Sequence, residues 1–121
     1  MTQPRYVLDL PSAELVLREI QQTCAYREWA LLAAHVRSTH VHVVVEGFDD
    51  PDRAIADFKA YASRPLNGRE GLKKGEAISR WSRGGSTRRL PDSNAIANAV
   101  RYVAEGQGVP MAVFVARYRE T

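Results

Sequence analysis

Residues 29 to 47 read "WALLAAHVRSTHVHVVVEG", and this stretch decides how the rest of the chain must be arranged. The first part is an apolar run of strand length, and the second is rich in β-branched valine, which favours extended structure. Arg37 to Thr39 form a tight connection between the two parts. We therefore predict two strands that pair as a hairpin, the second of them within residues 39 to 47.

The second strand carries two histidines separated by one valine. Successive side chains of a strand point to opposite faces, so His40 and His42 share one face and the neighbouring valines share the other. Two imidazoles side by side make a partial chelate for a divalent cation, and a third ligand must come from elsewhere. The alternative is that both rings lie on a solvated sheet face.

The length of the chain, 121 residues, allows one domain with a single core, so we expect one domain over residues 1–121. No apolar run approaches the roughly 20 residues that span a bilayer, and Pro4 and Arg5 stand where a signal peptide needs an apolar core. The single cysteine, Cys24, cannot form an internal disulfide, and its place on an apolar stripe predicts a core residue. We expect a cytoplasmic protein.

Positive charge is concentrated in one part of the sequence. Between Arg64 and Arg89 there are eight basic and two acidic residues, a net charge of +6 in a chain whose total is +3, which leaves −3 for the remainder. A concentrated basic segment is expected of a protein with a polyanion partner such as nucleic acid. The alternative is a flexible, solvated loop rich in charge.

Three other stretches have apolar residues at helical spacing. The first helix is expected to take Ser12 as its N-cap and to end near Glu28. The second should begin with Pro51 in its first turn and stop at Pro65. The third should run from Asp92 or Ser93 to Gly106.

Three short stretches complete the pattern of strands. "RYVLDL" at residues 5 to 10 is a short strand or a lead-in, "AISRW" at residues 77 to 81 is another strand, and "MAVFVARY" at residues 111 to 118 is the last. The order of elements predicts an α+β fold, an antiparallel or mixed sheet with helices packed on one face in a ferredoxin-like arrangement. We expect the other face to be free, with His40 and His42 pointing from it.

Four blocks of the chain, in order and with matching spacing, resemble the HUH single-tyrosine transposases of the smallest bacterial insertion sequences and their relatives associated with repetitive extragenic palindromes. The blocks are the paired strands "LLAAHVRSTHVHVVVEG", the following helix "DFKAYASRPLN", the next connection "RWSRGGSTRRL" and the tyrosine helix "AVRYVAEGQG". The resemblance covers nearly the whole chain and implies the HUH endonuclease fold.

By this resemblance the protein is a metal-dependent transposase that cuts and rejoins single-stranded DNA. His40 and His42 would bind Mg²⁺ or Mn²⁺, and Tyr102 would be the nucleophile that forms a 5′-phosphotyrosine link. The reference pKa of tyrosine is about 10, so its attack depends on a cation that polarises the phosphate. In the alternative reading, Tyr102 packs beside the apolar stripe of its helix with its hydroxyl in water.

The resemblance also implies a third metal ligand. Many members of the family carry it four residues after the tyrosine, where this chain has Gly106. Gln107 has the family's amide type one residue further on and is the expected ligand, with Glu105 as the second choice.

The expected partners are single-stranded DNA, including strands that form hairpins, and a second copy of the chain. In the implied homodimer, the tyrosine helix of one subunit can serve the histidine pair of the other, and the short first strand and apolar last strand leave edges that need covering. An alternative function is a nucleic-acid-binding module of the same fold without catalysis. The expected DNA-contacting residues are Lys59, Arg64, Arg80, Arg83, Arg88 and Arg89.

Overall fold

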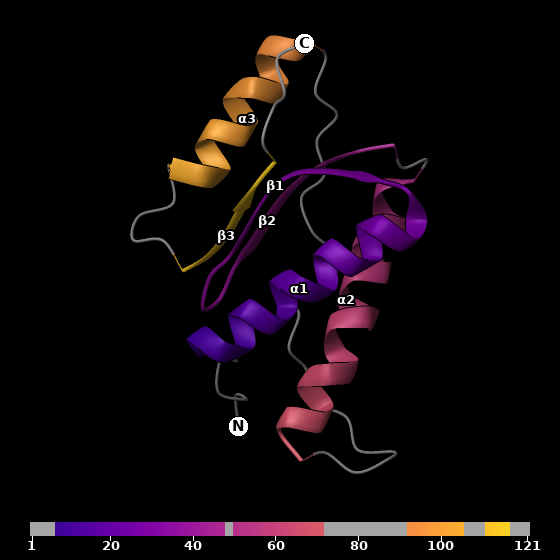
Figure 1. Cartoon of the computed structure of the whole chain (residues 1–121), viewed down its shortest axis with the longest axis vertical. Helices are drawn as coiled ribbons and strands as arrows, with labels where there is room; N and C mark the ends of the chain where they lie inside the picture. Colours follow the sequence, from indigo (N-terminus) through magenta and orange to yellow (C-terminus); the bar gives the residue numbers. More distant parts are fainter. Residues whose placement is uncertain (1–6, 48–49, 72–91, 106–110, 117–121) are drawn as a thin grey trace, which may run out of the picture.

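A computed structural model of the protein describes residues 7–47, 50–71, 92–105 and 111–116. In these residues the chain forms a three-stranded antiparallel sheet with helices packed against it, which confirms the predicted α+β class (Figure 1). The predicted strand at residues 77 to 81 lies outside the described residues. The elements in chain order are α1 (Leu10–Arg27), β1 (Ala30–Val36), β2 (Val41–Glu46), α2 (Pro51–Arg69), α3 (Ser93–Glu105) and β3 (Ala112–Val115).

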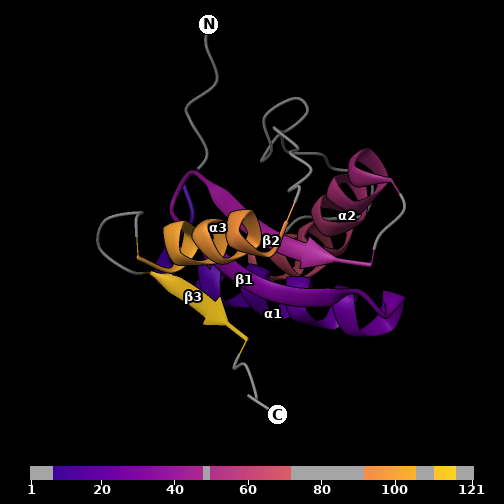
Figure 2. The ribbon, with the colours of Figure 1, turned by 90° about the horizontal axis from the view of Figure 1, so that it is seen from above.

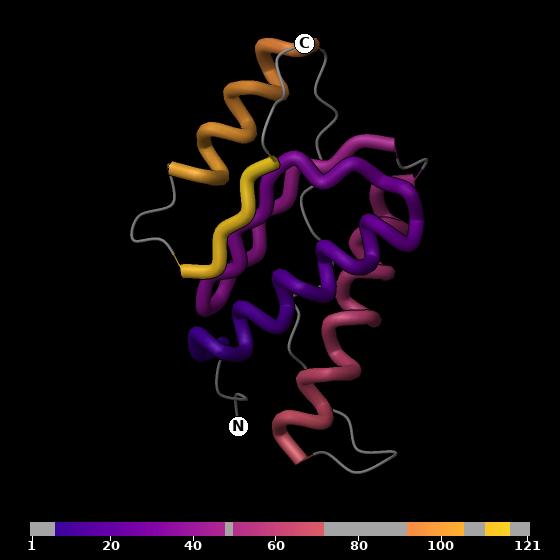
Figure 3. The backbone as a smooth tube through the Cα atoms, in the orientation of Figure 1, coloured from indigo at the N-terminus to yellow at the C-terminus, as the bar shows by residue number. Residues whose placement is uncertain are grey.

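The predicted hairpin is confirmed as the pair β1 and β2. Val36 lies opposite Val41, and His35 lies opposite His42. The turn is closed by the Arg37 N–H, which donates to the His40 carbonyl over 2.8 Å. The predicted last strand is confirmed at residues 112 to 115, where β3 pairs with the other edge of β1, so the strand order is β2-β1-β3 (Figure 3).

The hairpin contributes side chains to two hydrophobic clusters on opposite faces of the sheet. Val36 and Val43 pack in the larger cluster with α1 and α2. Ala33, three residues before Val36 in β1, and Val44, the residue after Val43 in β2, pack in the smaller cluster with Val103 of α3. Helix α3 therefore lies on one side of the sheet, and α1 and α2 lie on the other (Figures 1 and 2).

The expectation that all helices pack on one sheet face is wrong. The strand β1 reads "ALLAAHV", and its last four residues are all buried, so it needs cover on both faces. The apolar side of α3 packs over Ala33 and Val44 and so buries the second face of the sheet there. Because His42 and Val44 are two residues apart in β2, the histidine face is the face on which α3 packs.

The first helix starts earlier than predicted. Asp9, not Ser12, is the N-cap of α1, and its Oδ1 accepts the Ser12 N–H at 2.8 Å. Pro11 is tolerated in the first turn because an N–H at that position would have no acceptor within the helix. The helix ends at Arg27, close to the predicted end. The prediction for Cys24 is confirmed, since this side chain lies in the core and burial raises its pKa to about 11.

The second helix continues through Pro65, where the sequence predicts a stop. Helix α2 ends at Arg69, and Leu66 is fully buried between α1 and α2. Burying a leucine contributes about 1.5–3 kcal/mol, which is comparable with the roughly 3 kcal/mol cost of an interior proline. No helix among the described residues is long and apolar enough to cross a bilayer.

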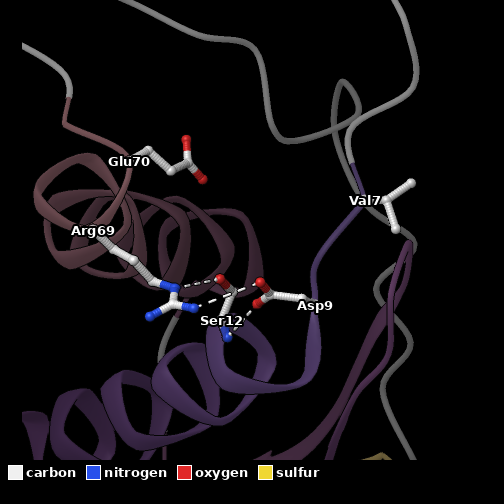
Figure 4. Close-up of a pocket in the computed structure, with 5 residues that line it drawn as sticks. All are labelled: Val7, Asp9, Ser12, Arg69 and Glu70. Carbon is white, nitrogen blue, oxygen red and sulfur yellow. Dashed lines mark hydrogen bonds and ion pairs between the residues drawn. The ribbon is translucent and has the colours of Figure 1, made fainter.

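A hydrogen bond and an ion pair join the end of α2 to the start of α1 (Figure 4). Arg69 Nε donates to Ser12 Oγ over 3.1 Å, and its guanidinium lies 3.5 Å from a carboxylate oxygen of Asp9. The hydrogen bonds from Ser12, with a smaller effect of Arg69, lower the pKa of Asp9. Together with Val7 and Glu70 these side chains line a pocket in which both charges of the ion pair are already matched.

Candidate functional site

The prediction that His40 and His42 share a face is confirmed. The two imidazole planes are nearly parallel, at 6°, and the ring centroids are 6.2 Å apart. His40 is exposed just before β2, and His42 is half-buried within it. The strand therefore presents two imidazoles side by side at the hairpin end of the sheet, as a two-ligand arrangement requires.

The ring of His40 is oriented by its neighbour in the turn. A hydrogen bond of 2.8 Å joins Thr39 Oγ1 and His40 Nδ1. In the tautomer whose Nδ1–H donates to the hydroxyl oxygen, Nε2 keeps its lone pair for a metal ion. In that tautomer Thr39 would act as an outer partner of the kind that metal-binding histidines usually have.

The surroundings of His42 favour the neutral form of its ring. Burial lowers the pKa of His42 below the ordinary histidine value, and the positive charges that His40, His35 and Arg37 can carry lower it further. A metal ion binds only the neutral imidazole, so protons compete less for this ligand than for an isolated histidine.

A third histidine, His35, belongs to the same face and was not considered in the sequence analysis. It lies directly opposite His42 in the hairpin, and only 1% of its surface is exposed. Its Nε2 accepts the Met111 N–H at 3.1 Å. The sequence allows this pairing to be predicted, because a hairpin whose turn is centred on residues 38 and 39 places residue 35 opposite residue 42.

Tyr102 is carried onto the histidine face by α3 of its own chain. The next residue, Val103, is buried against Ala33 and Val44. Burial lowers the pKa of the His35 ring, and the Val103 carbonyl partly opposes this shift. The Tyr102 side chain itself is 59% exposed. The structure thus brings the tyrosine helix over the sheet near His35 and leaves the tyrosine accessible.

The expected third metal ligand is not found among the described residues. Within residues 7–47, 50–71, 92–105 and 111–116, no group of three or more His, Cys, Asp and Glu side chains is arranged to hold a metal ion, so Glu105 does not complete the pair. Glu105 instead lines a pocket with Glu46 and Arg101. Gln107 lies outside the described residues.

The expected DNA-contacting residues are not brought together with the histidines where the structure describes them. Lys59 and Arg64 belong to α2, which packs on α1 across the sheet from the histidine face. The Arg64 guanidinium lies 5.2 Å from the ring centroid of Tyr61. The other four, Arg80, Arg83, Arg88 and Arg89, lie outside the described residues.

Comparisons of the chain with protein-family models, with curated proteins and with solved structures found no match.

We expect the protein to lose stability as the pH falls from about 7.5 to about 5.5, a range that spans the ordinary histidine pKa. Burial is the main cause that lowers the pKa values of His35 and His42 in the folded chain, so the unfolded chain binds protons first. Stability is then complete above the unfolded value and declines below it. Thermal unfolding measured across this range tests the expectation. A flat profile, or a melting temperature that rises on acidification, would contradict it.

Proposed function

We propose that the protein cuts and rejoins single-stranded DNA through a covalent tyrosine intermediate, as an HUH single-tyrosine transposase or a relative of one. One observation carries this proposal. The parallel imidazoles of His40 and His42 project from the sheet face on which the helix bearing Tyr102 packs. A pair of metal ligands and an accessible nucleophile on one surface is what this chemistry needs.

The side chains of the site fit a divalent cation. His40 and His42 would supply two nitrogen ligands, which suit Mn²⁺, and Gln107 would add an amide oxygen, which also suits Mg²⁺. A cation bound there would polarise the scissile phosphate and stabilise the charge that develops on it.

Tyr102 would carry out the transfer. Its phenolic oxygen gives up its proton to solvent and attacks the phosphorus, so that a bond between phosphorus and the tyrosine oxygen forms. The bond from phosphorus to the 3′-oxygen of the preceding nucleotide breaks, and this oxygen takes up a proton as a free 3′-hydroxyl. One phosphate ester replaces another, and attack by a 3′-hydroxyl reverses the step and joins DNA without ATP.

We assign the phosphate contacts to the basic segment of residues 64 to 89. Its net charge of +6 gives it the electrostatic attraction to a nucleic-acid backbone that single-strand binding requires. Lys59 and Arg64 lie across the sheet from the histidines, so contacts close to the cleaved phosphate fall to the four later arginines.

The proposal extends to assembly and location. A homodimer would cover the edges of the sheet at β2 and β3, where Val115 is 42% exposed. A free buried cysteine fits the reducing cytoplasm, where we place the protein.

A second candidate function is single-stranded nucleic-acid binding without catalysis. It is favoured by the surroundings of His40 and His42, which are not joined by a third His, Cys, Asp or Glu side chain among the described residues. The basic segment would serve such a module equally well.

Incubation of the protein with an end-labelled pool of random single strands and hairpins, in the presence of Mn²⁺, tests the proposal. We expect shortened strands whose new 3′-hydroxyl can be extended by a polymerase, and no cutting when EDTA is present or the DNA is fully duplex. Binding without cutting in both Mn²⁺ and Mg²⁺ would instead establish the binding module. Absence of binding would reject both functions.

A further inference from the structure

The ring of His35 lies between two parts of the chain that meet over the histidine face. On one side its Nε2 accepts the N–H of Met111, the residue just before β3, at 3.1 Å. Val103, in the last turn of α3, packs against Ala33 and Val44 on the sheet face that carries His35, and its main chain acts on the ring. With 1% of its surface exposed, the ring is enclosed by these neighbours and by the sheet.

The bond from Met111 determines the protonation of the ring. Nε2 accepts a hydrogen bond and so has a free lone pair, which in the neutral imidazole places the proton on Nδ1. This Nδ1–H is buried and has no hydrogen-bond partner among the described residues. A buried donor without a partner is costly and is rare in folded proteins.

The matching acceptor is a carbonyl at the end of α3. The helix ends at Glu105, so the Val103 carbonyl is one of the last four, which have no N–H partner within the helix. This carbonyl influences the His35 ring without reaching the geometry of a hydrogen bond. A small movement of the last turn of α3 toward the sheet would satisfy the donor and the acceptor together.

We propose that His35 is a positioning residue that fixes the tyrosine helix over the histidine pair. Through Nε2 it holds the start of β3. Through Nδ1–H it holds the Val103 carbonyl once the last turn of α3, which already packs on the sheet, moves slightly toward the ring. Tyr102 precedes Val103, and His42 is the strand partner of His35, so one ring sets the distance between nucleophile and metal ligands. This inference rests on the proposed function for its consequence in catalysis, but the hydrogen bond from Met111 and the proposed bond to Val103 do not depend on it.

The tautomer of His35 is the first test, and it needs neither DNA nor a variant. In a long-range nitrogen–proton NMR spectrum of the unmodified protein near neutral pH, we expect Nδ1 to be protonated and Nε2 to carry the lone pair. We also expect the Met111 amide to exchange slowly with solvent. A proton on Nε2, or an unprotected Met111 amide, would overturn the proposal.

Two substitutions of different chemistry give the second test. His35→Gln places an amide oxygen where Nε2 lies and keeps an acceptor for Met111, whereas His35→Phe keeps a ring and removes both nitrogens. We expect exchange at the Met111 amide to accelerate about tenfold in His35→Phe and to stay near the original rate in His35→Gln. If His35→Phe does not fold, His35→Asn, whose shorter side chain cannot reach Met111, replaces it.

The same variants separate positioning from general stability. In His35→Phe we expect kcat for strand cleavage to fall by about tenfold or more, with KM for DNA and Mn²⁺ affinity unchanged. His35→Gln should restore part of kcat. A rise in KM as large as the fall in kcat would show a merely structural role and reject the proposal. So would a fall in kcat that is equally large in His35→Phe and His35→Gln. If the unmodified protein cuts no DNA, the proposed function fails, while the NMR results still decide the role of His35.

Discussion

Replacing His42 with alanine is expected to abolish metal-dependent cleavage of single-stranded DNA while leaving the fold intact. Loss of an outer partner of a metal ligand already costs up to about 100-fold in activity, and loss of the ligand itself should cost more. The site would then retain one imidazole, His40, whose place before β2 is independent of the His42 side chain. Cleavage rates at saturating Mn²⁺, with circular dichroism as a check of folding, measure the effect.

The matched control for this variant is Val41→Ala. Val41 lies between the two histidines in the sequence and points to the opposite sheet face. It is 36% exposed, so its change to alanine removes two methyl groups without touching the proposed ligands. We expect its cleavage rate to stay close to that of the unmodified protein. Undiminished Mn²⁺-dependent cleavage by His42→Ala would refute the metal-site proposal.

A mixture of His42→Ala and Tyr102→Phe chains is expected to remain inactive. Helix α3 packs on the sheet of its own chain, where Val103 is buried against Ala33 and Val44. Each chain in the mixture therefore lacks one half of its own site. The measurement is strand cleavage after the two variants have been unfolded and refolded together, so that any subunits can exchange.

The opposite outcome has a clear meaning. If the tyrosine helix of one subunit serves the histidines of the other, a mixed dimer keeps one intact composite site and activity returns. Sizing by light scattering accompanies the experiment, because a monomer of 13.5 kDa leaves only the arrangement within one chain.

The hairpin could be predicted closely because its information is local. Valines at alternate positions and a short polar connection are sufficient to place β1, β2 and the shared face of His40 and His42. The helix boundaries were less accurate where competing effects were close in size. Pro65 disfavours a helix. The burial of Leu66 favours one, but it depends on packing against α1, and local sequence does not predict that contact.

The parts of the site that depend on tertiary packing were not predictable in the same way. The choice of sheet face for α3 follows from the burial of β1 on both faces, and "ALLAAHV" by itself is also compatible with a strand that has one solvated face. The role of His35 needed the pairing register and the position of Met111, which is 76 residues away in the sequence. Each of these features comes from long-range contacts.

Formation of a covalent bond between Tyr102 and DNA is the most direct test of the proposed chemistry. The protein is incubated with labelled single-stranded DNA and Mn²⁺, denatured, and digested, and the peptide that carries the label is identified by mass spectrometry. We predict a single adduct on Tyr102 that is absent in Tyr102→Phe and retained in Tyr26→Phe, a control at an exposed tyrosine of α1. An adduct that persists in Tyr102→Phe, or DNA cleavage without any adduct, would contradict the account.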